Sequence, residues 1–455
     1  MPVETENPEY TNSLSKWTLV RKCIAGAKAV RGAGTVFLPD PDPKEANKSI
    51  RYNPYKTRAQ FLNVTARTRN AMVGMAFRRP PEAELSGIDY IESNANGSGT
   101  NLDQLAKTIV GDLLEVGRIG LLADYPSAEQ GMSKEQINRL GLKATIKTYT
   151  AENIINWKTS IVNGESVLSL VTLLEDYEVN SDVFSQEKAK QYRVLRLEDN
   201  IYTQEVWRED EMISSFQPRA NGRLLNYIPM VIAGAYNNDP AVDDAALYDI
   251  AEINIGHYRN SADYEEGIFL HGQPMLHIDT GNMAASEFEM LNPNGIEVGA
   301  RRGIATSGGG NSSLLQAASN SAAHEAMVMK EQQMVSIGAR MIEAGGQAET
   351  AEAARIKHAG DNSVLTNIVQ NASDAIQLSL KWVAMFMGVS IEPSYDINDD
   401  FYDKTVNAQL LMSKIQLLDR GVIAADDIRD SLRKSGEIER EDDEIVADAE
   451  ATSPV

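Results

Sequence analysis

The stretch NIGHYRNSADYEE at residues 254–266, which follows NNDP at 237–240 and the acidic pair Asp243 and Asp244, decides how the fold of this chain is interpreted. It predicts one continuous helix from about Asp243 to about Glu266, with an aspartate at the N-terminal cap, where negative charge is favourable. One face of this helix is only partly apolar, so we expect it to pack against neighbouring helices rather than lie in a core. It contains no enzyme motif.

Length, composition and charge limit the possible classes of protein. With 455 residues the chain is expected to form roughly two to four substructures. Its hydrophobic fraction of 42% and charged fraction of 24% are ordinary for a globular protein. The net charge of −22 argues against a surface that grips nucleic acid broadly. A soluble protein and a conduit through which DNA slides are both compatible with it.

Targeting and redox signals are sparse. Cys23 is the one cysteine, which excludes an intrachain disulfide and a four-cysteine zinc site and favours a reducing compartment. The chain has no run of about 18 apolar residues, so no transmembrane helix is expected. The acidic N-terminus lacks an apolar segment, and a signal peptide is not expected either.

The first 240 residues predict an α+β module. Apolar spacing indicates helices at 13–29, 55–77 and 102–116, the last of them capped by Thr100 or Asn101. Short apolar or alternating runs between turn signals indicate strands, of which the runs at 192–197 and 201–207 are expected to pair. The expected strands lie at 117–126, 143–149, 154–157, 167–175, 192–197, 201–207 and 229–235.

A local excess of positive charge lies between residues 51 and 79, where no acidic residue occurs. The patch that we single out consists of Arg58, Arg67, Arg69, Arg78 and Arg79. These residues can form a solvated helix face that pairs with acids elsewhere, or they can contact DNA or an acidic partner. The segment alone does not decide between the two.

The region 267–313 is broken by glycines, and short strands fit at 274–278 and 295–298. A clear helix is expected at 314–344, where Met327, Met334 and Met341 repeat every seven residues. Such a repeat marks a seam against a packed helix. The seam can lie within one subunit or between identical subunits, and adaptable methionines suit a seam that must tolerate sliding.

The remaining sequence predicts helices and an acidic tail. A long helix is expected to follow Gly360 and to run to Met387, with Gly388 as its stop. Two short helices are expected within 401–433. Residues 437–450 are rich in glutamate and aspartate, a composition typical of solvated or disordered tails.

Signals for catalysis or metal binding are missing from the sequence. The five histidines form no His-x-x-x-His pair, and no Cys-x-x-Cys occurs. The glycines at 308–310 are not followed by the lysine of a phosphate-binding loop. We therefore predict no catalytic residue, no metal site and no cofactor, and expect that the chain is not an enzyme.

Several blocks, in the same order, resemble the portal proteins of tailed bacteriophages, in a branch known as a domain of unknown function. The blocks are NPYKTRAQF at 53–61, GMAFRRPP at 74–81, GRIGLLADYP at 117–126, NNDP at 237–240 and HYRNSAD at 257–263. They span about half of the chain. The later part resembles the family mainly in its layout.

The resemblance implies a portal-like α+β fold. Its parts are a mixed α/β wing, two long stem helices, a small β-containing clip, a tunnel loop and a helical C-terminal crown. The implied boundaries are 1–240 for the wing, 241–266 for the first stem helix, 267–313 for the clip, 314–344 for the second stem helix, 345–362 for the tunnel loop, 363–394 for a long wing helix and 395–455 for the crown with its acidic tail.

The resemblance also implies a function. A homo-oligomeric, dodecameric ring at one capsid vertex would conduct double-stranded DNA, without sequence specificity, during packaging and ejection. The implied partners are the terminase large subunit, the major capsid protein and a head–tail adaptor protein, with no membrane. The implied location is the virion, and the host cytoplasm during assembly.

The resemblance also implies roles for particular residues. Candidates for the DNA channel at the tunnel loop are Arg355, Lys357, His358 and Gln347, and candidates in the clip are Arg301 and Arg302. Candidates for packing between stem helices of neighbouring subunits are Met327, Met334, Met341 and Tyr258.

Other classes of protein stay open on the sequence. One is an acidic oligomeric scaffold, or another head–tail connector without a DNA channel role. Another is an enzyme with a carboxylate site, for which activity without a partner or a bound metal would be the sign.

Overall fold

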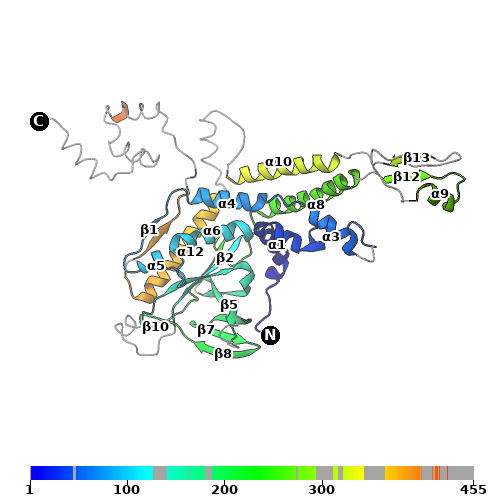
Figure 1. Cartoon of the computed structure of the whole chain (residues 1–455). Coiled ribbons are helices and arrows are strands. Elements are labelled where there is room, and N and C mark those ends of the chain that lie inside the picture. Colours follow the sequence, from blue (N-terminus) through cyan, green and yellow to red (C-terminus); the bar gives the residue numbers. More distant parts are fainter. Residues whose placement is uncertain are drawn as a thin grey trace. The chain divides into compact units, whose positions relative to one another are not determined.

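The computed structural model of the chain divides into two units, Met1–Asn398 and Asp399–Val455, each described by itself below. The residues that it describes are 2–44, 48–126, 141–162, 164–179, 187–272, 275–293, 311–315, 321–342, 364–390, 392–399, 401, 412, 416–418, 420 and 428. The first unit is a mixed α+β structure (Figure 1).

Four helices precede the first sheets. They are α1 (Pro8–Ala25), α2 (Ala27–Gly32), α3 (Lys48–Arg58) and α4 (Val64–Ala76), with a short 3-10 turn, η1, at Gly34–Val36. The helix predicted at 13–29 is interrupted at Gly26, whose φ of +87° is a conformation that favours glycine.

The prediction of a single helix at 55–77 is wrong. The chain instead forms α3 and α4, and the backbone between them is held by hydrogen bonds to side chains of a distant helix rather than by helical ones. Asn63 caps the second of the two, since its side chain accepts a hydrogen bond from the backbone N–H of Ala66.

The centre of the first unit is a three-stranded antiparallel sheet in the order β11-β2-β3, next to α6. Its elements are α6 (Leu102–Val116), β2 (Arg118–Asp124), β3 (Thr145–Thr150) and β11 (Met230–Gly234). The prediction for the helix at 102–116 is confirmed to the residue, and Asn101 forms a capping box with Gln104. The buried strand expected within 117–126 is also confirmed.

A five-stranded antiparallel meander follows, with its strands in chain order. Its elements are η2 (Ala151–Asn153), β4 (Ile154–Val162), β5 (Glu165–Glu178), β6 (Lys188–Glu198), β7 (Ile201–Arg208) and β8 (Glu211–Phe216). The predicted pairing of 192–197 with 201–207 is confirmed, and the turn between them places Asp199 and Asn200 at positive φ. The edge strand β8, exposed along most of its length, was not predicted.

Two helices, α8 (Tyr248–His271) and α10 (Ala322–Ile342), flank the antiparallel hairpin of β12 (Met275–Asp279) and β13 (Asn311–Leu315). In Figure 1 the helices lie side by side, α8 in green and α10 in yellow. A seven-residue helix, α9 (Ala285–Leu291), lies between the two strands in sequence and was not predicted.

The predicted ends of both helices need correction. The first begins at Tyr248, not near Asp243, because the Asp243 carboxylate accepts hydrogen bonds from the backbone N–H groups of Tyr236 and Asn237 and so closes the preceding loop. It also continues past Glu266 to His271. The second begins at Ala322, since the residues from 311 to 315 are paired in a strand.

The last long helix, α12 (Val364–Met387), packs on α6 and on the three-stranded sheet. Its predicted apolar face is buried, and Gly388 ends it with a φ of +67°. The remaining short elements of the first unit are β1 (Glu82–Glu84), α5 (Tyr90–Ser93), β9 (Arg219–Ala220), β10 (Arg223–Leu224) and β14 (Ser394–Asp396). In the second unit Phe401 and Ile428 are buried; most of 401–433 lies outside the described residues.

Gly117 allows the chain to pass from α6 into β2. Its φ is +72°, and a Cβ atom there would lie 2.8 Å and 2.9 Å from the backbone oxygens of Asp244 and Asp243. We expect Gly117→Ala to lower the free energy of unfolding by about 2–3 kcal/mol in urea titration. Gly222→Ala is the control, because Gly222 has a φ of +76° but open space around it. Equal losses in the two variants would show that the close approach contributes nothing.

Candidate functional site

The helix pair formed by α8 and α10 is the candidate functional element, and polar contacts set the register of its antiparallel packing. His257 Nε2 lies 3.0 Å from Glu331 Oε1, and Lys330 donates a hydrogen bond of 2.8 Å to the side-chain oxygen of Asn260. Met334, about one turn further along α10, is fully buried. The pair therefore combines one deeply packed methionine with specific polar contacts.

Polar side chains of α8 hold the segment between α3 and α4. Asn254, which is fully buried, accepts hydrogen bonds from Thr65 N (3.3 Å) and Thr65 Oγ1 (3.0 Å) and donates one to Leu62 O (2.7 Å). Ser261 accepts from Gln60 N (2.8 Å) and donates to Gln60 O (2.7 Å). Two of the sequence blocks singled out above, 53–61 and 257–263, therefore meet in space.

Further contacts strengthen the same junction. Tyr55 donates a hydrogen bond of 2.6 Å to Asp263, and burial together with this bond raises the pKa of the tyrosine. Arg58 is paired with Glu266, and Arg259 Nε donates to the backbone oxygen of Phe37 (2.8 Å). Five polar residues of the 254–266 stretch (Asn254, Arg259, Ser261, Asp263 and Glu266) thus position α8 on the N-terminal part of the chain.

A partly buried charge cluster joins α1, α4, α6 and η2. It consists of Arg21, Arg69, Asp112, Glu115 and Glu152. Arg21 contacts all three carboxylates, and Arg69 Nε lies 2.9 Å from Glu115 Oε1. Two cations therefore face three carboxylates, a balance that makes the cluster sensitive to the loss of either arginine.

The pKa shifts in the cluster have opposite signs. Burial raises the pKa of Asp112, and the nearby Arg21 only partly offsets this. Burial also acts to raise the pKa of Glu152, but the hydrogen bond and the charge of Arg21 outweigh it and the pKa is lowered. Sequence reasoning missed this cluster, because acids are too common in the chain for any one of them to stand out.

The basic patch predicted between 51 and 79 does not act as one surface. Arg58 and Arg69 are neutralised by Glu266 and Glu115, as expected for a structural role. Arg67 and Arg78 are exposed, whereas Arg79 is half-buried. Only part of the patch is therefore placed to meet a partner.

The residues predicted to pack between subunits are placed differently from one another. Tyr258 and Met334 are fully buried within this chain, so their side chains are not available to a second copy, and this part of the prediction needs correction. Met327 is half-buried, and the side chain of Met341 lies outside the described residues. Among the α10 side chains that the structure describes, the large apolar ones that are exposed are instead Val328, Met329 and Val335.

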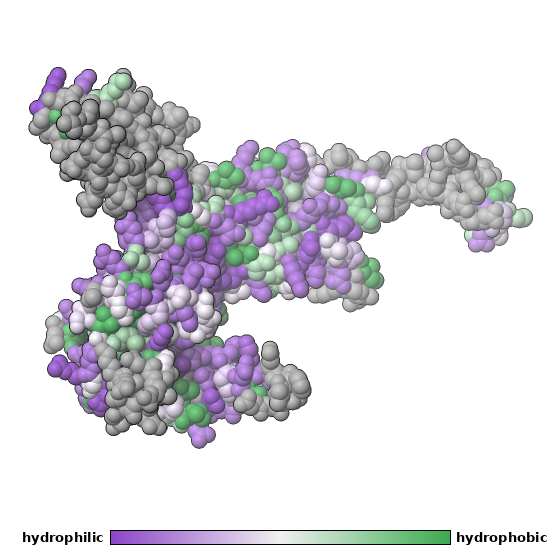
Figure 2. Space-filling view, turned by 60° about the vertical axis from the view of Figure 1, so that its left-hand side comes forward, coloured by the Kyte–Doolittle hydropathy of each residue, from purple (hydrophilic) through white to green (hydrophobic). Residues whose placement is uncertain are grey.

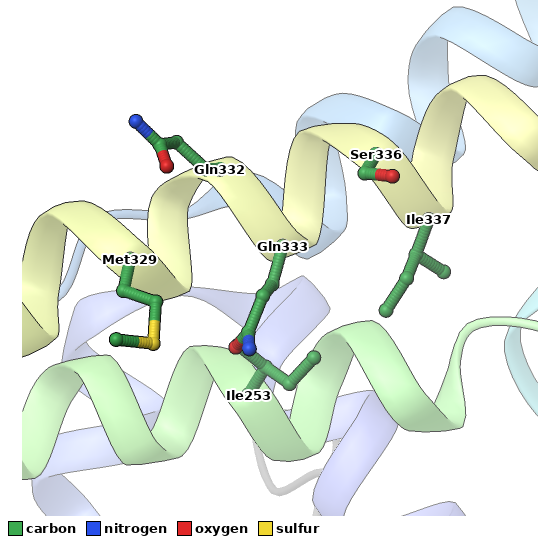
Figure 3. A pocket seen from close by; sticks show the side chains of 6 residues that line it. All are labelled: Ile253, Met329, Gln332, Gln333, Ser336 and Ile337. Atoms are coloured by element: carbon green, nitrogen blue, oxygen red, sulfur yellow. The ribbon is translucent and has the colours of Figure 1, made fainter.

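An open groove of about 480 Å³ runs between the two helices (Figure 3). It is lined by Ile253, Met329, Gln332, Gln333, Ser336 and Ile337. In Figure 3 Gln333 and Met329 project toward α8, whereas Gln332 points away from it. The lining contains no charged side chain, so it supplies no acid or base beside the hydroxyl of Ser336.

Chemistry-bearing groups do not gather elsewhere in the described part of the chain. Cys23 is buried, its thiol contacts the backbone oxygen of Ala251 at 3.8 Å, and burial raises its pKa to about 12. No group of three or more potential metal ligands occurs among the described residues. Of the helices that the structure describes, none has the length and apolar character needed to cross a bilayer.

The remaining predicted site residues cannot be placed. Arg355, Lys357, His358 and Gln347, expected at the tunnel loop, lie outside the described residues. So do Arg301 and Arg302, expected in the clip, and the strand expected at 295–298.

Comparison with known proteins adds a family match for part of the chain. Residues 246–387 match the model of a domain of unknown function (DUF4055). This range contains α8, the β12–β13 hairpin, α10 and α12. The chain is thus similar to this domain over its helix pair, and no curated protein matches the chain.

Solved structures of gene transfer agent particles are similar over most of the chain. A chain from the neck of an empty particle with C6 symmetry shares 14% identity, covers 86% of this chain and 94% of its own length, and has a TM-score of 0.42. One from the virion of a native particle shares 14%, covers 85% and 93%, and has a TM-score of 0.42. One from the neck of a native particle with C12 symmetry shares 15%, covers 86% and 93%, and has a TM-score of 0.41.

Proposed function

We propose that this chain is the portal protein of a tailed phage or a phage-like particle, a ring subunit and not an enzyme. The observation that carries the proposal is the antiparallel pair of α8 and α10, with a β hairpin between them in sequence and fixed on the N-terminal helices by Asn254, Ser261 and Asp263. In portal proteins the two stem helices, with the clip between them in sequence, have this order of elements. Two of the portal-like sequence blocks form the junction.

The proposed mechanism is non-covalent. Copies of the chain form a ring at one capsid vertex, held by the major capsid protein, and double-stranded DNA passes through it during packaging and ejection. The hairpin region docks the terminase large subunit and later a head–tail adaptor. An acidic conduit suits this task, because each neutralised phosphate adds a salt-dependent grip that slows sliding.

Residues for these steps are assigned from the resemblance. Arg355 and Lys357, with His358 and Gln347, are proposed to face DNA at the tunnel loop. Arg301 and Arg302 are proposed to act in the clip. The ring is proposed to assemble in the host cytoplasm and to remain in the virion.

Exposed apolar residues on the helix pair support self-association. Val335 is 67% exposed and Met329 is 58% exposed, and Figure 2 shows apolar residues scattered among polar ones on the surface. Val328, which is 39% exposed and seven residues before Val335, lies on the same helix face, and exposed apolar side chains that share a face are typical of an interface. A neighbouring copy of the chain would cover these exposed side chains. Tyr258 and Met334 cannot contact a neighbouring copy, because both are buried within their own chain.

The test is the mass and shape of the purified protein, by native mass spectrometry and negative-stain imaging. We expect a closed ring of about twelve subunits with a central hole. Val335→Asp should break the ring into smaller species. Ile161→Asp, at a position 81% exposed on β4, is the matched control and should leave the ring intact. A monomer or dimer that persists with scaffold and capsid proteins present would overturn the proposal.

A further inference from the structure

One face of α4 is exposed, polar and basic. Arg67, Asn70, Gly74 and Arg78 follow one another at intervals of three, four and four residues, so they share a helix face or its direct continuation, and all four are exposed. Lys107 of α6, also exposed, lies beside the end of this face, with its Nζ 5.4 Å from the ring centroid of Phe77. These five residues are called the basic face below.

Arg67 and Lys107, two cations of the basic face, differ from the neighbouring arginines in forming no ion pair with the described residues. Within the described part of the chain, no carboxylate lies at ion-pair distance from Arg67 or Lys107. Arg58 and Arg69, from the same basic segment, are both neutralised. In a chain with a net charge of −22, the basic face is a local site of opposite sign.

The helix itself does not explain this arrangement. A cation near the C-terminal end of a helix is stabilised by the helix dipole, which accounts for Arg78, and the ring of Phe77 accounts for the position of Lys107. Arg67 lies near the N-terminal end of α4, where a cation is unfavourable and where the first turn has no acidic residue. The helix dipole therefore does not explain the position of Arg67.

Gly74 is the second unexplained feature of the face. A glycine inside a helix destabilises it relative to alanine. No atom lies within 4 Å of the position that a Cβ of Gly74 would occupy, so packing among the described residues does not require a glycine. Close approach of something from outside the chain would require it, because a bare backbone lets a partner approach the helix axis.

The composition of the face favours a nucleic-acid backbone over a protein partner. Among the described residues of α4 and α6, no large apolar side chain is exposed, whereas protein interfaces depend on such anchors. Arg, Lys and Asn side chains are the usual donors to phosphate oxygens. The helical part of the face, from Arg67 to Gly74, extends for roughly 10 Å along the helix axis, which fits a chain of phosphates better than a single anion.

From these observations we infer that the basic face of α4 binds the phosphate backbone of double-stranded DNA. The inference rests on the proposed function and adds to it a contact in the N-terminal helices, separate from the tunnel loop and the clip. Arg67 and Lys107 supply charge, Asn70 supplies a neutral donor, and Gly74 lets the backbone approach.

The experiment measures the affinity of the full-length assembled protein for a short fluorescent DNA duplex of arbitrary sequence, by anisotropy at several salt concentrations. Arg67→Gln combined with Lys107→Gln should lower the slope of log affinity against log salt by about 1.8, or about 0.9 for each lost phosphate contact. Gly74→Glu should weaken binding at least about tenfold, whereas Gly74→Ala should raise the thermal midpoint of the protein. The control is Arg219→Gln combined with Arg223→Gln, two exposed cations on β9 and β10, which should leave the slope unchanged.

Two results of the binding measurement would overturn the inference that the basic face binds DNA. An unchanged slope and affinity in the Arg67/Lys107 variant, or a wild-type protein that binds no duplex at low salt, overturns the inference. A polyglutamate peptide that competes for the same residues as strongly as DNA identifies an acidic polypeptide partner and overturns it too. Ring formation, measured on the same samples, separates these failures from failure of the proposed function.

Discussion

Replacing Arg21 with methionine is expected to lower the free energy of unfolding by about 3–5 kcal/mol. Arg21 contacts Asp112, Glu115 and Glu152, and the first two are almost fully buried. Without it, only Arg69 remains to balance three carboxylates in a poorly solvated site. Urea denaturation of the full chain near neutral pH measures the loss.

The pH dependence of this variant has a definite sign. In the wild-type protein the lowered pKa of Glu152 contributes stability that is present above its unfolded pKa and is lost as the pH falls through its folded pKa. Without Arg21 the folded-state pKa values of the carboxyls rise, so the folded variant takes up protons more readily than the unfolded chain. We therefore expect its stability deficit to shrink between about pH 7 and pH 5.

The matched control is Lys16→Met on the same helix. Lys16 pairs with Asp244 at the surface, where the two side chains are 47% and 77% exposed, so the expected loss is at most about 1 kcal/mol. A loss from Arg21→Met that is no larger than this would show that the cluster does not stabilise the fold.

Asn254→Leu is expected to cost about 3–5 kcal/mol and to prevent ring assembly. The substitution keeps the side-chain volume nearly constant but leaves the backbone N–H and hydroxyl of Thr65 buried without these partners, and it removes one of the two hydrogen bonds to the Leu62 carbonyl. Each unsatisfied buried group costs about 1–3 kcal/mol. Urea titration measures the stability, and native mass spectrometry measures the assembly.

Asn260→Leu provides the same chemical change at a less buried position of α8. Asn260 accepts one hydrogen bond, from Lys330, so the expected cost is about 0.5–1.5 kcal/mol. If the two variants proved equally stable, the junction between α8 and the segment 59–65 would not depend on the buried amide.

Elements whose limits are set locally could be predicted from the sequence. The helix at 102–116 has its capping residues beside it in sequence, and α12 has a clean apolar stripe that ends at Gly388. The strands of the three-stranded sheet were evident from short apolar runs between turn signals. In these cases the local preference and the tertiary environment agree.

Elements whose limits are set by distant residues could not be predicted. The break between α3 and α4 depends on Ser261 and Asn254, and the late start of α8 depends on Asp243 binding the preceding loop. The same holds for the candidate site. The methionine repeat predicted a packing seam, and only the fold shows that Met334 faces inward while Val335 faces outward.

The junction between α8 and the segment 55–65 has a consequence for synthesis of the protein. Its hydrogen bonds join residues that are between 189 and 208 positions apart in sequence. A ribosome that adds about 5–20 residues per second needs roughly 10–40 seconds to cover that distance. During this interval the nascent N-terminal helices lack the side chains that satisfy Gln60, Leu62 and Thr65. The N-terminal part of the protein can therefore reach its final structure only after α8 has left the ribosome.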